Sequence, residues 1–244
     1  MHMFFVKPAQ IEGGLVTVTG PDVNHIRNVL RMKPGEPVRI SDEKDFCGQC
    51  RVTEILEDRV LLSVEEEAPS TELPARVTLF QGLPKGDKME WIVQKNTELG
   101  VSRIVPVAMR RSVVKLDARK AEAKRVRLQA IAESAAKQSG RTRLPKVLPV
   151  MSYGEALREA KDCDLLLLPY ESAEGMDRTR ELLARAFPGM HIGILIGPEG
   201  GFDPSEVEQA AEAGWQAFSL GPRILRTETA GMAVLAMLGF LLET

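Results

Sequence analysis

Short runs in which polar and β-branched apolar residues alternate fill much of the first 65 or so residues. Each run is bounded by glycine, proline or aspartate, which is typical of strands. The clearest runs lie at residues 15–20, 37–42, 47–56 and 60–65. The pattern predicts a small β-barrel over residues 1–70, with a linker in the charged, proline-bearing segment Glu65–Ala75.

One helix is expected to interrupt these strands. Asp22 stands at a position suited to an N-terminal cap. The apolar residues that follow have helical spacing and fall on one face, and they are Val23, Ile26, Val29 and Leu30.

From Val77 onward, apolar strand patterns alternate with helix patterns. Strands are expected at residues 76–83, 103–109, 164–170, 191–197 and 216–221, and helices at 87–99, 117–139, 204–213 and from about 227 or 229 to 242. Two of the strand patterns are apolar throughout, which is typical of a parallel sheet covered on both faces. This alternation predicts an α/β domain with a largely parallel sheet over residues 71–244.

Three of these strands end in turns that contain glycine or proline, near Pro169, in the segment 197–201 and at Gly221. Ligands of open α/β sheets bind outside the carboxyl ends of the strands. The segment 197–201 matches neither the P-loop nor the dinucleotide fingerprint. Its backbone N–H and C=O groups suit an uncharged heterocycle such as adenine, although the turns could also be merely sharp. The next helix has a cap of its own, with Asp203 at the N-cap, Pro204 first and Glu206 third.

Charge is distributed unevenly, although the net charge is only −2. Residues 85–146 carry 16 Lys and Arg against 6 Asp and Glu, a net of +10. Residues 1–70 carry 8 against 12, a net of −4, and residues 147–244 carry 7 against 15, a net of −8. The basic block is either a solvated helix face or a surface for a phosphate backbone.

The sequence gives little support for a metal site, a disulfide framework or a membrane-spanning helix. The three cysteines suit a reducing, cytoplasmic setting, and Cys47 and Cys50 lack the further ligands of a zinc site. The three histidines are far apart in sequence, so no metal is expected. The apolar run 230–242 is too short to span a bilayer, and it favours a helix in a core or a subunit interface.

Five separated motifs carry a resemblance that covers nearly the whole chain. They read HIRNVLRMKPG from His25, MEWIVQKNTELGVSRIVPV with RRS from Met89, QSGR from Gln138, IGPEGGF from Ile196 and LGPRILRTETA from Leu220. In this combination the chain resembles the RsmE family, SPOUT-class methyltransferases that methylate N3 of a uridine in 16S ribosomal RNA. The resemblance implies a PUA-like N-terminal barrel, a C-terminal α/β domain with a trefoil knot, S-adenosylmethionine in the knot, and a homodimer.

Candidate site residues follow from the chemistry of such a transfer, from the strand-end turns and from the basic segments. Arg226 would stabilise the deprotonated uracil and Glu228 would accept its N3 proton, although the two could instead pair with each other or cap the helix. The expected cofactor contacts are Leu168, Pro169, Tyr170, Glu171, Ile196, Gly197, Pro198, Glu199, Gly200, Gly201, Leu220, Gly221, Ile224, Leu225 and Thr229. The expected RNA contacts are His25, Arg27, Arg31, Lys85, Lys88, Lys95, Arg110, Arg111, Arg141 and Arg143.

Two residues depart from the family pattern. Met3 stands where the family commonly has arginine, which puts one RNA contact in doubt, and Lys137 stands where glutamate is common. The general base, the nucleotide position, and the choice between naked RNA and an assembled small subunit stay open. Two alternatives also stay open, a SPOUT methyltransferase for another nucleotide and a non-catalytic RNA-binding or ribosome-assembly protein.

Overall fold

The computed structural model describes residues 1–173 and 175–243, and the chain divides into two compact units. The first unit contains Met1–Glu72 together with Ala136–Leu144. The second contains Leu73–Ala135 together with the chain from Pro145 onward. The long helix α3 therefore contributes its last turn to the first unit, and the segment after that helix also belongs there.

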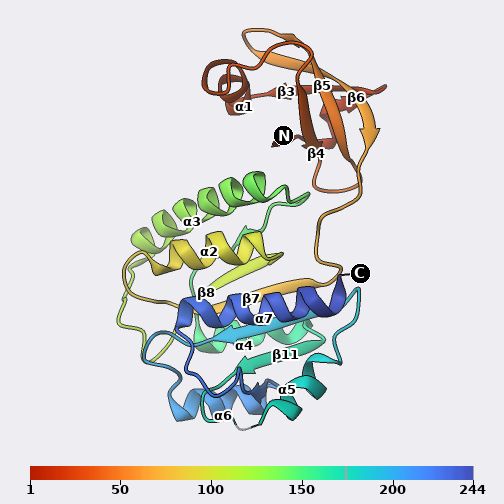
Figure 1. The fold of residues 1–244 in the computed structure, drawn as a ribbon. Helices are drawn as coiled ribbons and strands as arrows, with labels where there is room; N and C mark the ends of the chain where they lie inside the picture. The colour runs from red at the N-terminus through yellow and green to blue at the C-terminus, as the bar shows by residue number, and fades with distance from the viewer. Residues whose placement is uncertain (174, 244) are drawn as a thin grey trace. The chain divides into compact units, whose positions relative to one another are not determined.

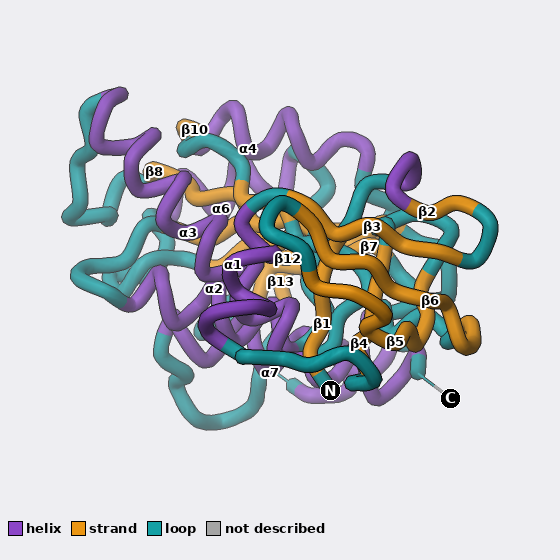
Figure 2. Tube along the Cα trace, turned by 90° about the horizontal axis from the view of Figure 1, so that it is seen from above, coloured by secondary structure: helices purple, strands orange, loops and turns teal. Residues whose placement is uncertain are grey.

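The first unit is a curled six-stranded sheet with the order β1-β4-β5-β6-β3-β2 (Figures 1 and 2). Its strands are β1 (His2–Phe5), β2 (Ile11–Glu12), β3 (Leu15–Thr19), β4 (Pro37–Ser41), β5 (Cys47–Ile55) and β6 (Arg59–Glu67). β1 pairs with β4 in parallel and the other neighbours are antiparallel. Alternate residues such as Val16 and Val18 point into one core, as the sequence pattern predicts.

The helical part of this unit differs from the prediction. A 3₁₀ turn covers Pro8–Gln10, α1 covers only Pro21–Asn24, and a π-helix follows over His25–Val29. Gly20, not Asp22, is the N-cap residue, because Pro21 already occupies the first helical position. The wider π turn, with Leu30 N donating to His25 O, moves Val29 off the apolar face, and its side chain is 61% exposed.

The second unit is built on a parallel sheet with the order β10-β8-β7-β12-β11-β13, and β9 also pairs with β8 (Figure 1). Its strands are β7 (Arg76–Gly82), β8 (Arg103–Ala108), β9 (Lys146–Val147), β10 (Met151–Ser152), β11 (Leu165–Pro169), β12 (His191–Ile196) and β13 (Gln216–Phe218). Its helices are α2 (Lys88–Glu98), α3 (Ala118–Ser139), α4 (Tyr153–Glu159), α5 (Met176–Leu183), α6 (Pro204–Glu212) and α7 (Thr227–Leu242), with a 3₁₀ turn at Ala160–Asp162.

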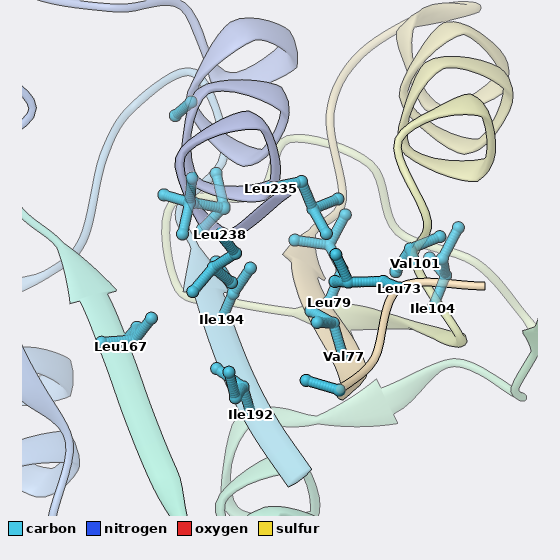
Figure 3. Close-up of a cluster of buried hydrophobic side chains, with 14 of the residues drawn as sticks. Leu73, Val77, Leu79, Val101, Ile104, Leu167, Ile192, Ile194, Leu235 and Leu238 are labelled. Atoms are coloured by element: carbon cyan, nitrogen blue, oxygen red, sulfur yellow. The ribbon is translucent and has the colours of Figure 1, made fainter. Parts of the chain in front are cut away.

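Side chains cover this sheet on both faces, as its apolar strands predict. On one face Leu79 and Ile194 belong to the same core as Leu235 and Leu238 of α7 (Figure 3). On the other face, Phe80 and Leu195 share a core with residues of α4 and α6. All six residues of β12 are buried. Within the described residues, no helix is long and apolar enough to cross a membrane.

Candidate cofactor pocket and active site

A pocket of about 800 Å³ opens where β11, β12 and β13 end. Three loops form it, at residues 169–173 with 175 and 176, at 196–202 and at 219–226, together with the first turn of α7 and one residue of α2. Its volume lies within the roughly 300–1,000 Å³ of typical small-molecule sites. The strand ends that the sequence singled out therefore surround one cavity.

Glycines allow the second of these loops to lie against the sheet. An ideal Cβ on Gly82, at the end of β7, would lie 2.6 Å from Pro198 N, closer than real Cβ contacts come. A Cβ on Gly197 would lie 3.2 Å from Gly201 C, and Gly201 itself has a φ of +69°. The loop thus folds tightly on itself and on the sheet, which larger residues at these positions would prevent.

A buried hydrogen-bond chain fixes the same loop to α7. Gln81 Nε2 donates to Thr227 Oγ1 over 2.9 Å, and Thr227 Oγ1 donates to Gly197 O over 2.6 Å. Gln81 is the last residue but one of β7 and Thr227 begins α7, so three segments that are distant in sequence meet here. Because these groups are buried, the chain holds the pocket wall more firmly than an exposed one would.

The third loop, residues 219–226, is fixed by hydrogen bonds at its start and is exposed to solvent at its tip. Thr179 Oγ1 of α5 donates to Ser219 O over 2.8 Å, and Gly221 N donates to Ser219 Oγ. Gly221 has a φ of +104°, a conformation that favours glycine. At the tip, Ile224 is 83% exposed.

Charged side chains lie on one side of the pocket. Lys88 Nζ is 2.9 Å from Glu199 Oε1 and 3.7 Å from Glu228 Oε2. Burial alone would raise the pKa of Glu199, but hydrogen bonds from Lys88 and from backbone amides, including Lys85 N, bring it below its usual value. Arg226 is the N-cap residue of α7, and its side chain is exposed. Both predicted catalytic residues therefore line the pocket.

Most of the predicted cofactor contacts line this pocket, and three do not. Leu168 is buried in the core behind it, Gly200 packs against Arg111, and Thr229, in the first turn of α7, is not among the residues that line the pocket. The pocket also includes residues that the sequence did not suggest as cofactor contacts, and these are Ala173, Gly175, Met176, Phe202, Ser219, Pro222, Arg223, Thr227 and Ala230. Phe202 is the last residue of the motif IGPEGGF, which could have pointed to it.

Several of the predicted RNA contacts have partners inside their own unit. The Arg141 side chain is only 4% exposed and forms an ion pair with Glu72, which also accepts hydrogen bonds from Thr142 N and Arg143 N. A buried guanidinium cannot reach a phosphate, so the Arg141 prediction is corrected to a structural role. Lys95 pairs with Glu98, and Lys88 belongs to the pocket.

The turn that follows β8 is hydrogen-bonded to the second pocket loop, residues 196–202, which is called the cofactor loop below. Arg111 Nη1 donates to Gly200 O over 3.1 Å, Arg110 Nη1 lies 3.4 Å from Asp203 Oδ1, and Arg110 N donates to the buried Glu206. Glu206 also accepts from Asp203 N, as the predicted capping box requires. The side chains of Arg110 and Arg111 remain exposed, as do those of His25, Arg27, Arg31, Lys85 and Arg143.

Met3 and Lys137, the two residues that depart from the family pattern, both lie in the first unit. Met3 is buried in β1. Lys137 Nζ lies 2.7 Å from Asp22 Oδ1 and 5.8 Å from the centroid of the Phe4 ring. Asp22 thus neutralises the charge of Lys137.

Comparisons with known proteins agree with this geometry. Two family models match, an RNA methyltransferase domain over residues 71–239 and an RNA methyltransferase PUA domain over residues 18–65. The ribosomal RNA small subunit methyltransferase E of Bacillus subtilis is 39% identical, over 100% of this chain and 98% of the relative. The chain belongs to the ribosomal RNA small subunit methyltransferase E family. The RsmE resemblance read from the five motifs is thereby confirmed.

Solved structures of RsmE-like proteins share the whole fold. A ribosomal RNA small subunit methyltransferase E from Neisseria gonorrhoeae, bound to S-adenosylmethionine, has a TM-score of 0.84 and 35% identity over 99% of this chain and 98% of its own. A methyltransferase from Legionella pneumophila, also with S-adenosylmethionine, has a TM-score of 0.83 and 28% identity over 98% and 97%. The predicted fold class, a PUA-like unit followed by a SPOUT-like α/β unit, is confirmed.

Proposed function

We propose that this chain transfers the methyl group of S-adenosylmethionine to N3 of a uridine in 16S ribosomal RNA. One observation carries the proposal: the glycine-lined pocket at three strand ends has a carboxylate and a guanidinium on its wall. The names of the relatives, which specify ribosomal RNA and S-adenosylmethionine, support the substrate and the cofactor.

The residues present fit S-adenosylmethionine. Apolar side chains of Ile196, Leu220 and Leu225 line the pocket beside the backbone of the three glycine- and proline-bearing turns. Such a surface offers stacking area and amide groups to an adenine ring, and it needs no phosphate-binding loop. When bound, S-adenosylmethionine would supply a methyl group already activated on a sulfonium sulfur. The trefoil-knot crossing of the loops at 196–202 and 219–226 is part of the proposal.

The protein's own task is to prepare the nucleophile. N3 of uracil carries a proton at neutral pH, and removing it leaves a negative charge shared with O2 and O4. The Glu228 carboxylate would accept that proton; its Oε2 is buried, has no hydrogen-bond partner among the described residues and lies 3.7 Å from Lys88 Nζ. Arg226, at the exposed start of α7, would donate hydrogen bonds to the charged carbonyl oxygen.

Positioning supplies much of the remaining rate enhancement. The target base must leave its stack to reach the pocket, as in other enzymes that modify bases. Exposed basic residues in each unit, among them Arg27 and Arg143 of the first and Lys85 and Arg110 of the second, would bind RNA phosphates and fix the register of the strand. Within the described residues, no group of three or more His, Cys, Asp or Glu side chains could hold a metal ion.

The assembly is proposed to be a cytoplasmic homodimer that acts on the small ribosomal subunit. α7 is apolar almost all round, and Phe240 and Leu241 on it are 87% and 47% exposed. Trp91 of the neighbouring helix α2 is also exposed, and the two helices lie side by side (Figure 1). A second copy would cover this apolar surface. A monomer mass by light scattering at micromolar concentration would argue against the dimer.

A product-mapping assay tests the reaction itself. The protein is incubated with S-adenosylmethionine and small-subunit ribosomal RNA, and the RNA is digested and analysed by mass spectrometry. N3-methyluridine at a single position supports the proposal. A methyl group on another atom or nucleotide would favour a different RNA methyltransferase, and binding without transfer would favour an assembly role.

A further inference from the structure

Lys88 has surroundings that an RNA-phosphate contact does not explain. It is the first residue of α2, and its side chain lines the pocket in the second unit. Its Nζ lies between two carboxylates from different segments, 2.9 Å from Glu199 Oε1 of the cofactor loop and 3.7 Å from Glu228 Oε2 of α7. Its side chain is 34% exposed, so the ammonium is only partly available to solvent.

The charges explain why this lysine is needed. Without Lys88, two negatively charged carboxylates, those of Glu199 and Glu228, would face the same space with no positive charge between them. Glu199 would keep hydrogen bonds from backbone amides, including Lys85 N. Glu228 Oε2 is buried and has no hydrogen-bond partner within residues 1–173 and 175–243, so its nearest compensating group is the Lys88 ammonium. Arg226 and Arg223 also line the pocket, but both side chains are exposed.

We propose that Lys88 is a positioning residue that holds the cofactor loop and the proton-accepting carboxylate in place, and that it does not bind RNA phosphate. Its link to Glu199 fixes the loop of residues 197–201, and its link to Glu228 keeps that side chain on the pocket wall. The part of this role that concerns the reaction rests on the proposed function. The part that concerns S-adenosylmethionine binding needs neither RNA nor turnover.

The first test replaces Lys88 by methionine, which keeps most of the length of the side chain and removes the charge. Lys88→Met should weaken S-adenosylmethionine binding about 3- to 10-fold, the scale of a partly exposed charged contact. It should slow methyl transfer further, by roughly 10- to 100-fold at saturating cofactor, because a displacement of about 1 Å at a reacting group is that costly. Lys88→Arg should recover part of both losses. Lys161→Met, at an exposed lysine of the second unit outside the pocket and outside the predicted RNA contacts, is the control and should bind the cofactor as the wild type does.

The second test asks whether Lys88 acts through Glu199. In a double-mutant cycle, Lys88→Met should weaken cofactor binding much less when Glu199→Gln is already present, because the two side chains share one interaction. Calorimetry gives the four dissociation constants, and thermal unfolding of each variant shows that it is folded. Equal losses in both backgrounds would overturn the proposal.

The salt dependence of RNA binding separates the two roles of Lys88. A phosphate contact contributes about one unit to the slope of log K against log salt concentration, so losing it lowers the slope by about one. Lys88→Met should leave the slope unchanged. A slope reduced by about one, with cofactor affinity retained, would make Lys88 an RNA contact and overturn the proposal. A wild-type protein that transfers no methyl group would refute the proposed function instead, and the calorimetric cycle would still decide the role of Lys88.

Discussion

Replacing Gly82 by alanine should damage the cofactor pocket without damaging the fold. The new Cβ would lie 2.6 Å from Pro198 N, 2.7 Å from Pro198 Cδ and 2.9 Å from Met109 Sδ. The methionine can move aside, but the proline cannot, because Gly197 O is held by Thr227 and Glu199 is held by Lys88. Ordinary contact begins at 3.4 Å, so the loop must shift by the difference between 3.4 and 2.6 Å, about 0.8 Å.

Overpacking of this kind costs about 1–3 kcal/mol. If that cost falls on the cofactor-bound conformation, S-adenosylmethionine binds roughly 5- to 150-fold more weakly. Calorimetry measures the affinity, and a thermal melt reports the fold. Gly154→Ala is the matched control, because its Cβ would meet nothing closer than 3.7 Å, in helix α4. A Gly82→Ala protein whose affinity stays within twofold of the wild type would refute this account of the loop.

The remaining predictions concern the chemistry and the first unit. Arg226→Ala should fold and bind cofactor but lose about 10²–10³ in turnover, the scale of one oxyanion-type donor, measured by single-turnover methyl transfer. Glu228→Gln should slow methylation most near neutral pH. The loss of rate should shrink as the pH rises, because uracil then ionises without a base. A loss of rate that stays constant with pH would give Glu228 a structural role. Burial raises the pKa of Glu72, but the Arg141 ion pair and backbone hydrogen bonds lower it overall. The stabilising contribution of Glu72 is therefore fully present at pH values above the usual glutamate pKa. It is lost as the pH falls through the lowered pKa of Glu72 in the folded protein. Glu72→Gln should cost roughly 3–5 kcal/mol at pH 7 and should flatten the acid side of the stability profile in denaturant melts.

Most of the sheet could be predicted because its pattern is local. The run 191–197 is apolar apart from His191, and the structure buries all of β12. The capping box at Asp203 likewise forms as its residues predict. α4 was not expected, although Ser152 and Glu155 form the same kind of capping box there. The π-helix His25–Val29 of the first unit could not be predicted, because its wider turn has no signature in the spacing of apolar residues.

The site was predictable only where glycine and proline mark backbone turns. Those residues located part of each of the three loops, but not the partners of side chains that meet across the fold. Lys88 and Arg141 looked like members of one basic block, yet Glu199 and Glu72, their partners, are far away in sequence. Charge counted along a chain therefore overestimates the basic surface wherever long-range ion pairs neutralise it.

The most direct test of the central claim is transfer of a tritiated methyl group from S-adenosylmethionine to RNA, with naked 16S ribosomal RNA and assembled small subunits compared in parallel. The account predicts incorporation of about one methyl group per RNA on at least one of these substrates, mapped to N3 of a single uridine, and its loss in Arg226→Ala. No incorporation on either substrate by a folded, cofactor-binding protein, or a methyl group mapped to any other atom, would contradict it.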